Sequence, residues 1–167
     1  MVTIANEPLK GKDIAMSLLE MIGDIPLFKN FSEEEKKAFA KMDHSMQAFN
    51  KGDTIIKEGE HYTSLYLLIR GTAQVTREGY DSPVALLKAG SVFGEISFLT
   101  RRARQSNVIA NENILAIKID DAFFAKLDLA MRDKIKNYLI ELLANRLDSM
   151  NEALSKIAKY ARGYAVL

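Results

Sequence analysis

The residues with the clearest chemical potential lie between Val92 and Ala110, in the stretch VFGEISFLTRRARQSNVIA. Gly94 allows close backbone approach, and the short helical run 96–99 that follows offers unpaired N–H groups and a positive dipole end, which suits a phosphate. Arg104 supplies a forked, permanently charged partner for phosphate oxygens. Glu95 would repel a phosphate, so we expect it to accept hydrogen bonds from sugar hydroxyls or to pair with a cation. Together these groups predict a site for a small anion that carries hydroxyls.

This stretch resembles the phosphate-binding cassette of the cyclic nucleotide-binding domain family. The similarity consists of the order F-G-E at 93–95, nine positions from Glu95 to Arg104, two small or polar residues and an alternating apolar strand. The resemblance extends from about residue 28 to about residue 158 and includes members like the catabolite activator protein and the protein kinase A regulatory subunit. It implies that Glu95 receives the ribose 2′-hydroxyl and that Arg104 neutralises the cyclic phosphate.

The resemblance also implies the rest of the binding set, with backbone N–H groups around three of its members completing the phosphate cage. The predicted ligand-binding residues are Phe93, Gly94, Glu95, Ile96, Ser97, Arg104, Gln105, Ser106, Arg146 and Asn151, and the three cage residues are Ile96, Ser97 and Gln105. Ala103, Gln105 and Ser106 depart from the common family pattern. Gln105 does not settle the base. On general grounds we expect cAMP, with cGMP as the alternative and Asn151 as the reader of the base.

A less specific interpretation stands beside this one. An arginine and a glutamate nine residues apart are more often surface residues or a structural ion pair that bridges a loop. Gly94, the short helix and the strand after Arg104 favour the binding site. Arg101 and Arg102 add positive charge nearby; we expect both to be solvated, where their charge can help to steer an anion inward.

Composition excludes several classes of function. The 23 basic and 22 acidic residues nearly cancel, so no global field attracts nucleic acid or an anionic membrane. With no cysteine there is no disulfide, thiolate metal site or thiol sensor. His44 and His61 stand in polar surroundings without a ligand pattern and are predicted to lie on the surface. We therefore expect no catalytic residues, no metal, no resident cofactor and no enzymatic activity.

The N-terminal stretch MVTIANEPLKGKD lacks the basic and then apolar pattern of a signal peptide. No apolar run approaches the length needed to cross a bilayer. The sequence therefore predicts a cytoplasmic protein that does not enter the membrane.

The predicted fold class is mainly β with helices (α+β). We expect an antiparallel β-roll, a double-stranded β-helix similar to a jelly roll, between N-terminal helices and a long C-terminal helix. The expected parts of this single domain, 1–167, are a helical segment at 1–45, the β-roll with the cassette at 46–120, and the lid and dimerisation helices at 121–167.

The individual elements follow from periodicity and capping residues. An apolar stripe predicts a helix over 13–22, and Ser32 with Glu35 predicts a capping box before a second helix. Strands are predicted at 65–70 and 73–75, joined as a hairpin across Gly71, and at 84–87 before a turn at 88–91. A second strand pair, 108–110 with 114–119, is expected around a tight polar turn, and Asp120 with Asp121 caps the next helix.

One long helix is predicted from about 131 to 162, because no proline or glycine interrupts this segment. Its apolar residues alternate spacings of three and four, which is a heptad seam at Ile140, Leu143, Leu147, Met150, Leu154, Ile157 and Ala161. We expect a homodimer through this helix, the alternative being a long helix that only covers a monomer's core. Residues 143–158 resemble the dimerising helix of catabolite activators, which implies lid contacts from Arg146, Met150 and Asn151.

The sequence as a whole predicts a non-enzymatic cyclic nucleotide sensor that transmits ligand binding through its C-terminal helix. One alternative is a dimeric scaffold that keeps this fold without a ligand. Another is the sensor half of a truncated transcription regulator, because the residues after the long helix leave no room for a helix-turn-helix region. We expect no DNA-binding region in this chain, and the sequence does not identify a downstream partner.

Overall fold

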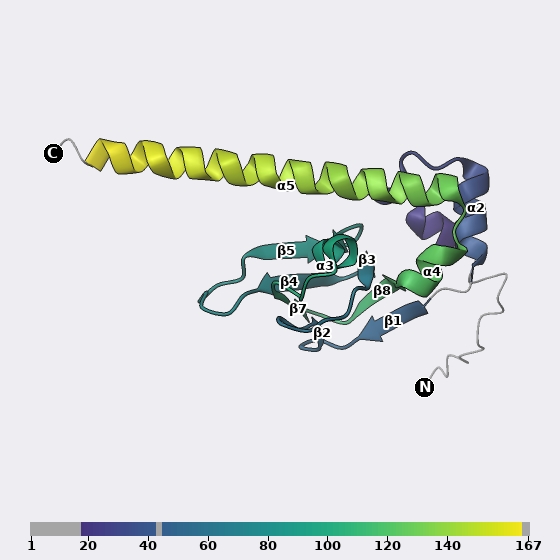
Figure 1. Ribbon diagram of the computed structural model, residues 1–167. Helices are drawn as coiled ribbons and strands as arrows, with labels where there is room; N and C mark the ends of the chain where they lie inside the picture. The colour runs from purple at the N-terminus through teal and green to yellow at the C-terminus, as the bar shows by residue number, and fades with distance from the viewer. Residues whose placement is uncertain (1–17, 43–44, 165–167) are drawn as a thin grey trace, which may run out of the picture.

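The computed structural model of the protein describes residues 18–42 and 45–164, and within them it has two antiparallel sheets of four strands each (Figure 1). Sheet 1 has the order β1 (Ser45–Phe49), β8 (Ile114–Ile119), β3 (Leu65–Arg70) and β6 (Val92–Phe93). Sheet 2 has the order β2 (Thr54–Ile56), β7 (Asn107–Ala110), β4 (Thr72–Thr76) and β5 (Ala85–Lys88). This arrangement confirms the predicted antiparallel β-roll with flanking helices.

The N-terminal helices form as predicted where the structure describes them. Residues 18–22 are helical and end at a turn at 23–24, whereas the predicted part 13–17 lies outside the described residues. The 3-10 helix η1 (Pro26–Phe28) follows, and then α2 (Glu33–Lys41). Glu35 N donates to Ser32 Oγ at 3.2 Å and Ser32 N donates to Glu35 Oε2 at 2.6 Å, which confirms the capping box.

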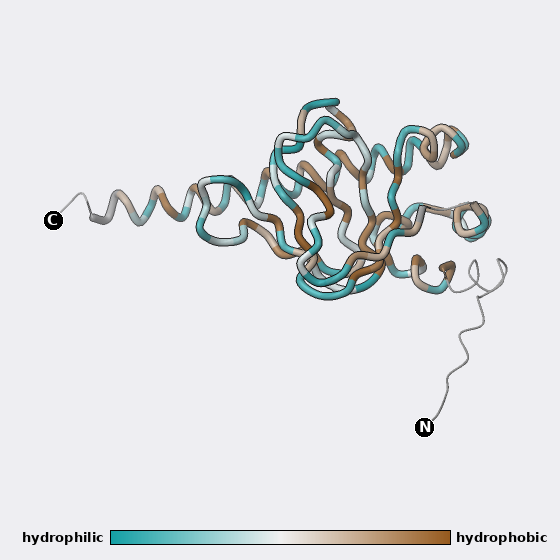
Figure 2. Tube along the Cα trace, turned by 90° about the horizontal axis from the view of Figure 1, so that it is seen from below, coloured by the Kyte–Doolittle hydropathy of each residue, from teal (hydrophilic) through white to brown (hydrophobic). Residues whose placement is uncertain are grey.

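Strand β3 separates two hydrophobic clusters. Leu65, Leu67 and Ile69 pack among the helices, while Tyr66 and Leu68 face the interior of the roll. A strand with both faces buried has no polar alternation, which explains the continuous apolar run in this segment. Seen from below, the apolar segments of the strands, drawn in brown, lie inside the roll (Figure 2).

Helices α4 (Asp121–Lys126) and α5 (Leu129–Tyr164) close the roll on the helical side. Asp120 Oδ1 accepts from Phe123 N at 2.9 Å, so Asp120 is the N-cap of α4 as predicted. The first part of α5 buries Met131, Ile135 and Leu139 in the helical cluster. Two ion pairs tie it to the N-terminal region: Lys134 with Glu35 at 2.6 Å and Lys29 with Glu141 at 2.7 Å.

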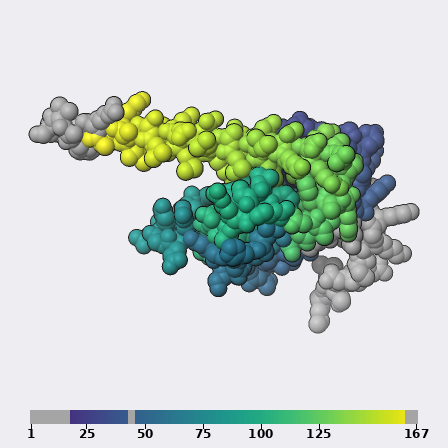
Figure 3. Space-filling view, in the orientation of Figure 1, coloured from purple at the N-terminus to yellow at the C-terminus, as the bar shows by residue number. Residues whose placement is uncertain are grey.

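The second part of α5 extends past the roll and stands clear of it (Figure 3). Its large apolar side chains are exposed and include five members of the predicted seam: Ile140, Leu147, Met150, Leu154 and Ile157. The pairing of this face with a second copy stays a prediction. Among the described residues, no helix combines the length and the apolar character that a bilayer crossing requires.

Both predicted strand hairpins are wrong. Strand β3 belongs to sheet 1 and β4 to sheet 2, so the chain does not fold back across Gly71. Strand β7 pairs with β2 and β4, whereas β8 pairs with β1 and β3. Alternation within each strand shows which residues are buried but not which sheet the strand joins, so sequence neighbours were taken for spatial neighbours.

The two misassigned turns meet where the chain passes from one sheet to the other. Asn111 N donates to Thr72 O at 3.0 Å, and Thr72 Oγ1 donates to Glu112 at 2.9 Å. Gly71 has φ +89°, and a Cβ at this position would lie 2.7 Å from Ile114 Cγ2 and 3.0 Å from Asn113 O. This crossing therefore requires a residue without a side chain.

We predict that Gly71→Ala lowers the free energy of unfolding by about 2 to 4 kcal/mol, because strain at positive φ adds to a backbone and side-chain clash. Gly52→Ala is the matched control, since Gly52 has φ +91° and nothing within 4 Å of the added Cβ. Its expected loss is about 1 kcal/mol. Urea denaturation of both variants measures the difference, and equal losses would contradict the clash at the crossing.

Candidate functional site

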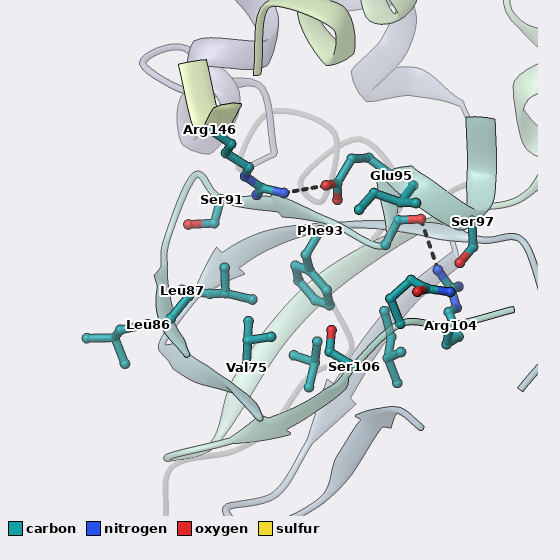
Figure 4. A pocket seen from close by; sticks show the side chains of 16 residues that line it. Val75, Leu86, Leu87, Ser91, Phe93, Glu95, Ser97, Arg104, Ser106 and Arg146 are labelled. Atoms are coloured by element: carbon teal, nitrogen blue, oxygen red, sulfur yellow. Dashed lines mark hydrogen bonds and ion pairs between the residues drawn. The ribbon is translucent and has the colours of Figure 1, made fainter. Parts of the chain in front are cut away.

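A cavity of about 390 Å³ opens where sheet 2, the cassette and α5 meet (Figure 4). One part of its wall is polar and contains Ser91, Glu95, Ser97, Arg104, Gln105, Ser106 and Arg146. The other part is mainly apolar and contains Ile56, Val75, Ala85, Leu86, Leu87, Phe93, Ile96 and Val108. A cavity with one charged end and one apolar end fits a ligand that combines an anionic group with an aromatic ring.

Helix α3 (Glu95–Thr100) begins directly after Gly94, which has φ +80°. A Cβ on Gly94 would lie 2.7 Å from Arg104 Nη1 and 3.0 Å from Ser64 O. The glycine is thus required by the approach of the arginine as well as by its backbone conformation. Ile96 and Ser97 lie in the first turn of α3, where N–H groups have no partner within the helix.

Arg104 is a buried cation, with only 3% of its surface exposed. Its Nη1 donates to Gly94 O at 2.9 Å and its Nη2 donates to Ser64 O. Among the buried polar side-chain atoms of the described residues, Nε of Arg104 has no hydrogen-bond partner. Burial lowers the pKa of Arg104 because desolvation disfavours the charged form. A desolvated cation held mainly by carbonyl oxygens favours the entry of an anion.

Glu95 is buried to the same degree, at 3% exposed, and its carboxylate pairs with Arg146 from α5. Arg146 also donates from Nη2 to Val92 O at 3.1 Å, so the long helix holds the strand and the carboxylate of the cassette together. A carboxylate accepts several hydrogen bonds at once. Glu95 can therefore hold Arg146 and a ligand hydroxyl together.

Phe93 forms part of the apolar wall, and its ring stacks on Tyr66 with centroids 5.4 Å apart. Burial raises the pKa of Tyr66 to about 12, so its phenol is neutral at physiological pH. An uncharged aromatic pair inside the roll keeps this wall apolar.

The structure brings nine of the ten predicted residues to the cavity. They are Phe93, Gly94, Glu95, Ile96, Ser97, Arg104, Gln105, Ser106 and Arg146. Their contact with a ligand stays a prediction.

The tenth residue, Asn151, does not reach the cavity, and neither does Met150. Asn151 is exposed on α5 beside Asp148 and Glu152, in a separate surface hollow. Met150 is exposed as well. Neither residue lines the cavity in this structure, because α5 contacts the cassette through Arg146 and the residues that follow are exposed. Their contact with a ligand stays a prediction.

Two polar groups near the cavity have partners that the sequence did not indicate. Arg101, expected to be solvated, forms a two-pronged ion pair with Asp121 of α4 at 2.7 and 2.8 Å, although both side chains remain exposed. Neither Arg101 nor Arg102 lines the cavity. Gln105 Nε2 donates to Ala103 O at 2.9 Å, so part of its amide serves its own turn.

The part of the apolar wall that β4 and β5 contribute was missed by sequence reasoning. Val75, Leu86 and Leu87 were recognised as strand residues, but their place beside the cassette depends on the pairing of β4 with β5 and β7. Alternation was a signal for the strands and not for this pairing. In the part of the chain that the structure describes, no group of three or more His, Cys, Asp or Glu residues could hold a metal ion.

The sequence is similar to a known protein family and to two kinds of protein kinase component. The family profile described as cyclic nucleotide-binding domain matches residues 46–128. The human cGMP-dependent protein kinase 2 is 30% identical over 125 residues, which cover 72% of this chain and 16% of that protein. The cAMP-dependent protein kinase regulatory subunit of Yarrowia lipolytica is 30% identical over 113 residues, 68% of this chain and 30% of that protein. The chain thus spans less than a third of the length of these relatives.

Solved structures show the same fold. The domain described as "Sp-2Cl-cAMPS bound to PKAR CBD2" superposes with a TM-score of 0.71 at 22% identity, covering 88% of this chain and 94% of that one. The catabolite activator protein of Thermus thermophilus superposes with a TM-score of 0.68 at 24% identity, covering 80% of this chain and 63% of that one.

We predict that Arg146→Met lowers the free energy of unfolding by about 1 to 3 kcal/mol, because it leaves a buried carboxylate without its cation. The range lies below that of a fully buried pair because 41% of the Arg146 side chain is exposed to screening water. Lys156→Met, at an exposed position on the same helix, is the control and should change stability by less than about 0.5 kcal/mol. Equal effects in chemical denaturation would show that Glu95 does not depend on Arg146.

Proposed function

Since the chain belongs to the cyclic nucleotide-binding domain family, we propose that it is a non-enzymatic sensor that binds a cyclic nucleotide in the cassette cavity. The observation that carries this proposal is the buried guanidinium of Arg104 at a cavity that also contains the buried carboxylate of Glu95. We expect cAMP as the ligand, with cGMP as the alternative, and no resident cofactor. The cytoplasmic location expected from the sequence is part of the same proposal.

Arg104 and Glu95 bind different parts of the ligand. Arg104 attracts the cyclic phosphate, and N–H groups in the first turn of α3 donate to the phosphate oxygens. Glu95 accepts a hydrogen bond from the ribose, because a carboxylate in a desolvated site favours a hydroxyl over a phosphate. The base then lies along the apolar wall formed by Val75, Leu87 and Phe93.

The identity of the base is the open part of this proposal. The relatives include proteins named for cAMP and for cGMP, at nearly equal identity. Gln105 uses one amide donor on Ala103 O, and Asn151 lies away from the cavity. We therefore expect adenine to be selected by other groups, which approach the base when α5 moves on ligand binding.

Ligand binding is transmitted through α5, because Arg146 connects this helix to Glu95 and to the carbonyl of Val92. A ligand that draws Glu95 toward the ribose changes the geometry of this contact. The coupling requires that the two positions of α5 differ in nucleotide affinity, since a ligand shifts an equilibrium only by its differential affinity.

We also propose that the chain forms a homodimer through the exposed second half of α5. Five residues of the predicted seam are more than half exposed: Ile140, Leu147, Met150, Leu154 and Ile157. Their heptad spacing is typical of a helix that pairs with an identical helix. A monomer would leave this stripe in water.

The alternative of a scaffold without a ligand is less favourable. In such a protein the desolvation cost of Arg104, whose Nε is unpaired, would not be offset by the binding of an anion. The sensor half of a transcription regulator remains the second candidate, supported by the shared fold of the Thermus thermophilus activator.

Calorimetric titration with cAMP and cGMP tests the proposal. We expect binding of at least one nucleotide, and we expect Arg104→Leu to weaken it by about 2 to 5 kcal/mol, as for loss of one member of a desolvated charge pair. Arg102→Leu is the matched control, because Arg102 is exposed, lies two positions away and does not line the cavity. Unchanged affinity in Arg104→Leu would refute the phosphate role, and no binding of either nucleotide to the wild-type chain would favour the scaffold.

For the dimer, we expect the double variant Leu147→Asp and Leu154→Asp to be monomeric, because it places charges in the middle of the seam. Both leucines are about 60% exposed in one chain, so the fold of each subunit should be retained. The control is Ser149→Asp with Lys156→Asp, which has the same spacing outside the seam and should remain dimeric. Light scattering measures the mass, and a seam variant that still shows twice the chain mass would exclude this interface.

A further inference from the structure

The loop 57–64 between β2 and β3 surrounds Arg104 on several sides. Arg104 N donates to Glu60 O at 2.8 Å, and Gly59 N donates to Arg104 O at 2.9 Å. Ser64 O accepts from the guanidinium at the other end of the loop. Main-chain contacts from three residues of one loop therefore fix both the backbone and the head group of this arginine.

Tyr62 belongs to the same loop and contacts the guanidinium with the face of its ring. The centroid of the ring lies 4.3 Å from Arg104 Cζ, which is a close cation–π distance. Tyr62 does not line the cavity, whereas Arg104 does. The tyrosine is thus in a position to act on a ligand through Arg104.

The ring itself has a fixed position. Its hydroxyl donates to Ile55 O in β2 at 3.0 Å, and the ring packs against the cluster inside the roll. Burial raises the pKa of Tyr62, so the hydroxyl keeps its proton and remains a donor at neutral pH. The ring is therefore a rigid surface rather than a mobile side chain.

We propose that Tyr62 is a positioning residue for Arg104, holding the guanidinium plane in the orientation that a ligand phosphate requires. This inference rests on the proposed function. Glu95 pairs with Arg146, whereas Arg104 contacts two carbonyl oxygens and the face of the Tyr62 ring. An aromatic face stabilises the cation without neutralising it, so the charge stays available to an incoming anion.

The chemistry of this arrangement differs from that of an ion pair. A carboxylate on Arg104 would have to be displaced or shared when an anion binds, because both compete for the same N–H groups. A ring contacts the face of the guanidinium, so it does not compete for the in-plane N–H groups that Gly94 O and Ser64 O leave unoccupied. The contact with the Tyr62 ring therefore orients the guanidinium and leaves its remaining N–H donors available to an anion.

The test is calorimetric titration of cAMP and cGMP into wild type, Tyr62→Leu and Tyr62→Phe. We expect Tyr62→Leu to weaken binding about fivefold to thirtyfold, the range for a desolvated cation–π contact. Tyr62→Phe keeps the ring and should stay within about threefold of wild type. Tyr80→Leu makes the same change at an exposed tyrosine outside the cavity and should bind like wild type.

A double-mutant cycle separates positioning from a structural role. If Tyr62 acts through Arg104, Tyr62→Leu adds no further loss in an Arg104→Leu background. A full additional loss there, or a Phe variant as weak as the Leu variant, would overturn the inference. If Tyr62→Leu does not fold in circular dichroism, Tyr62→Met replaces it in both comparisons.

The outcomes also distinguish this inference from the proposed function. Wild-type protein that binds neither nucleotide contradicts the function and this inference together. Wild-type protein that binds, with Tyr62→Leu equal to it, contradicts the role of Tyr62 alone.

Discussion

The site depends on one buried positive charge. Arg104 is held by two carbonyl oxygens and the face of a tyrosine ring, and its Nε has no partner among the described residues. Such an arrangement is unfavourable for the empty protein, because desolvation of a cation is only partly offset by neutral dipoles. A ligand with a single negative charge would complete it. The surrounding features, including the glycine at 94 and the loop 57–64, follow from the need to hold this group.

The second charged group connects the cavity to the rest of the chain. Glu95 contacts Arg146, and the helix that carries Arg146 is anchored at its other end by Glu35 and by the helical cluster. Sheet 1 lies between this cluster and the interior of the roll, with β3 contributing side chains to both. Cavity, sheet and long helix therefore form a continuous packed path, through which a ligand of the proposed sensor would act on the position of the helix.

The parts of the fold that are local in sequence could be predicted, and the parts that depend on pairing could not. The capping box at Ser32 and the N-cap at Asp120 are local signals and were confirmed. The turn at Gly71 was located correctly but given the wrong partner, because alternation does not indicate which sheet a strand joins. In the site, eight cavity residues were predicted from the cassette motif and Arg146 from the resemblance of the long helix, while Tyr62 and the wall residues Val75, Leu86 and Leu87 come from other segments. Asn151 was predicted from the resemblance of residues 143–158 to a dimerising helix, and in this structure it lies in a separate surface hollow, because a position carried over by resemblance does not show where the helix leaves the roll.

The length of α5 has a mechanical consequence. From Arg146 to Tyr164 the helix spans 18 positions, or about 27 Å at roughly 1.5 Å per residue. With the cassette as fulcrum, a tilt of about 10° would carry the far end through about 5 Å, one full helical pitch. In the proposed sensor, a small rotation of α5 at the cassette would thereby move a surface that is remote from the ligand. Arg146 lies near the middle of α5, with 17 positions before it and 18 after it, so in the proposed sensor the helix would act as a lever arm that carries a rotation at the cavity outward.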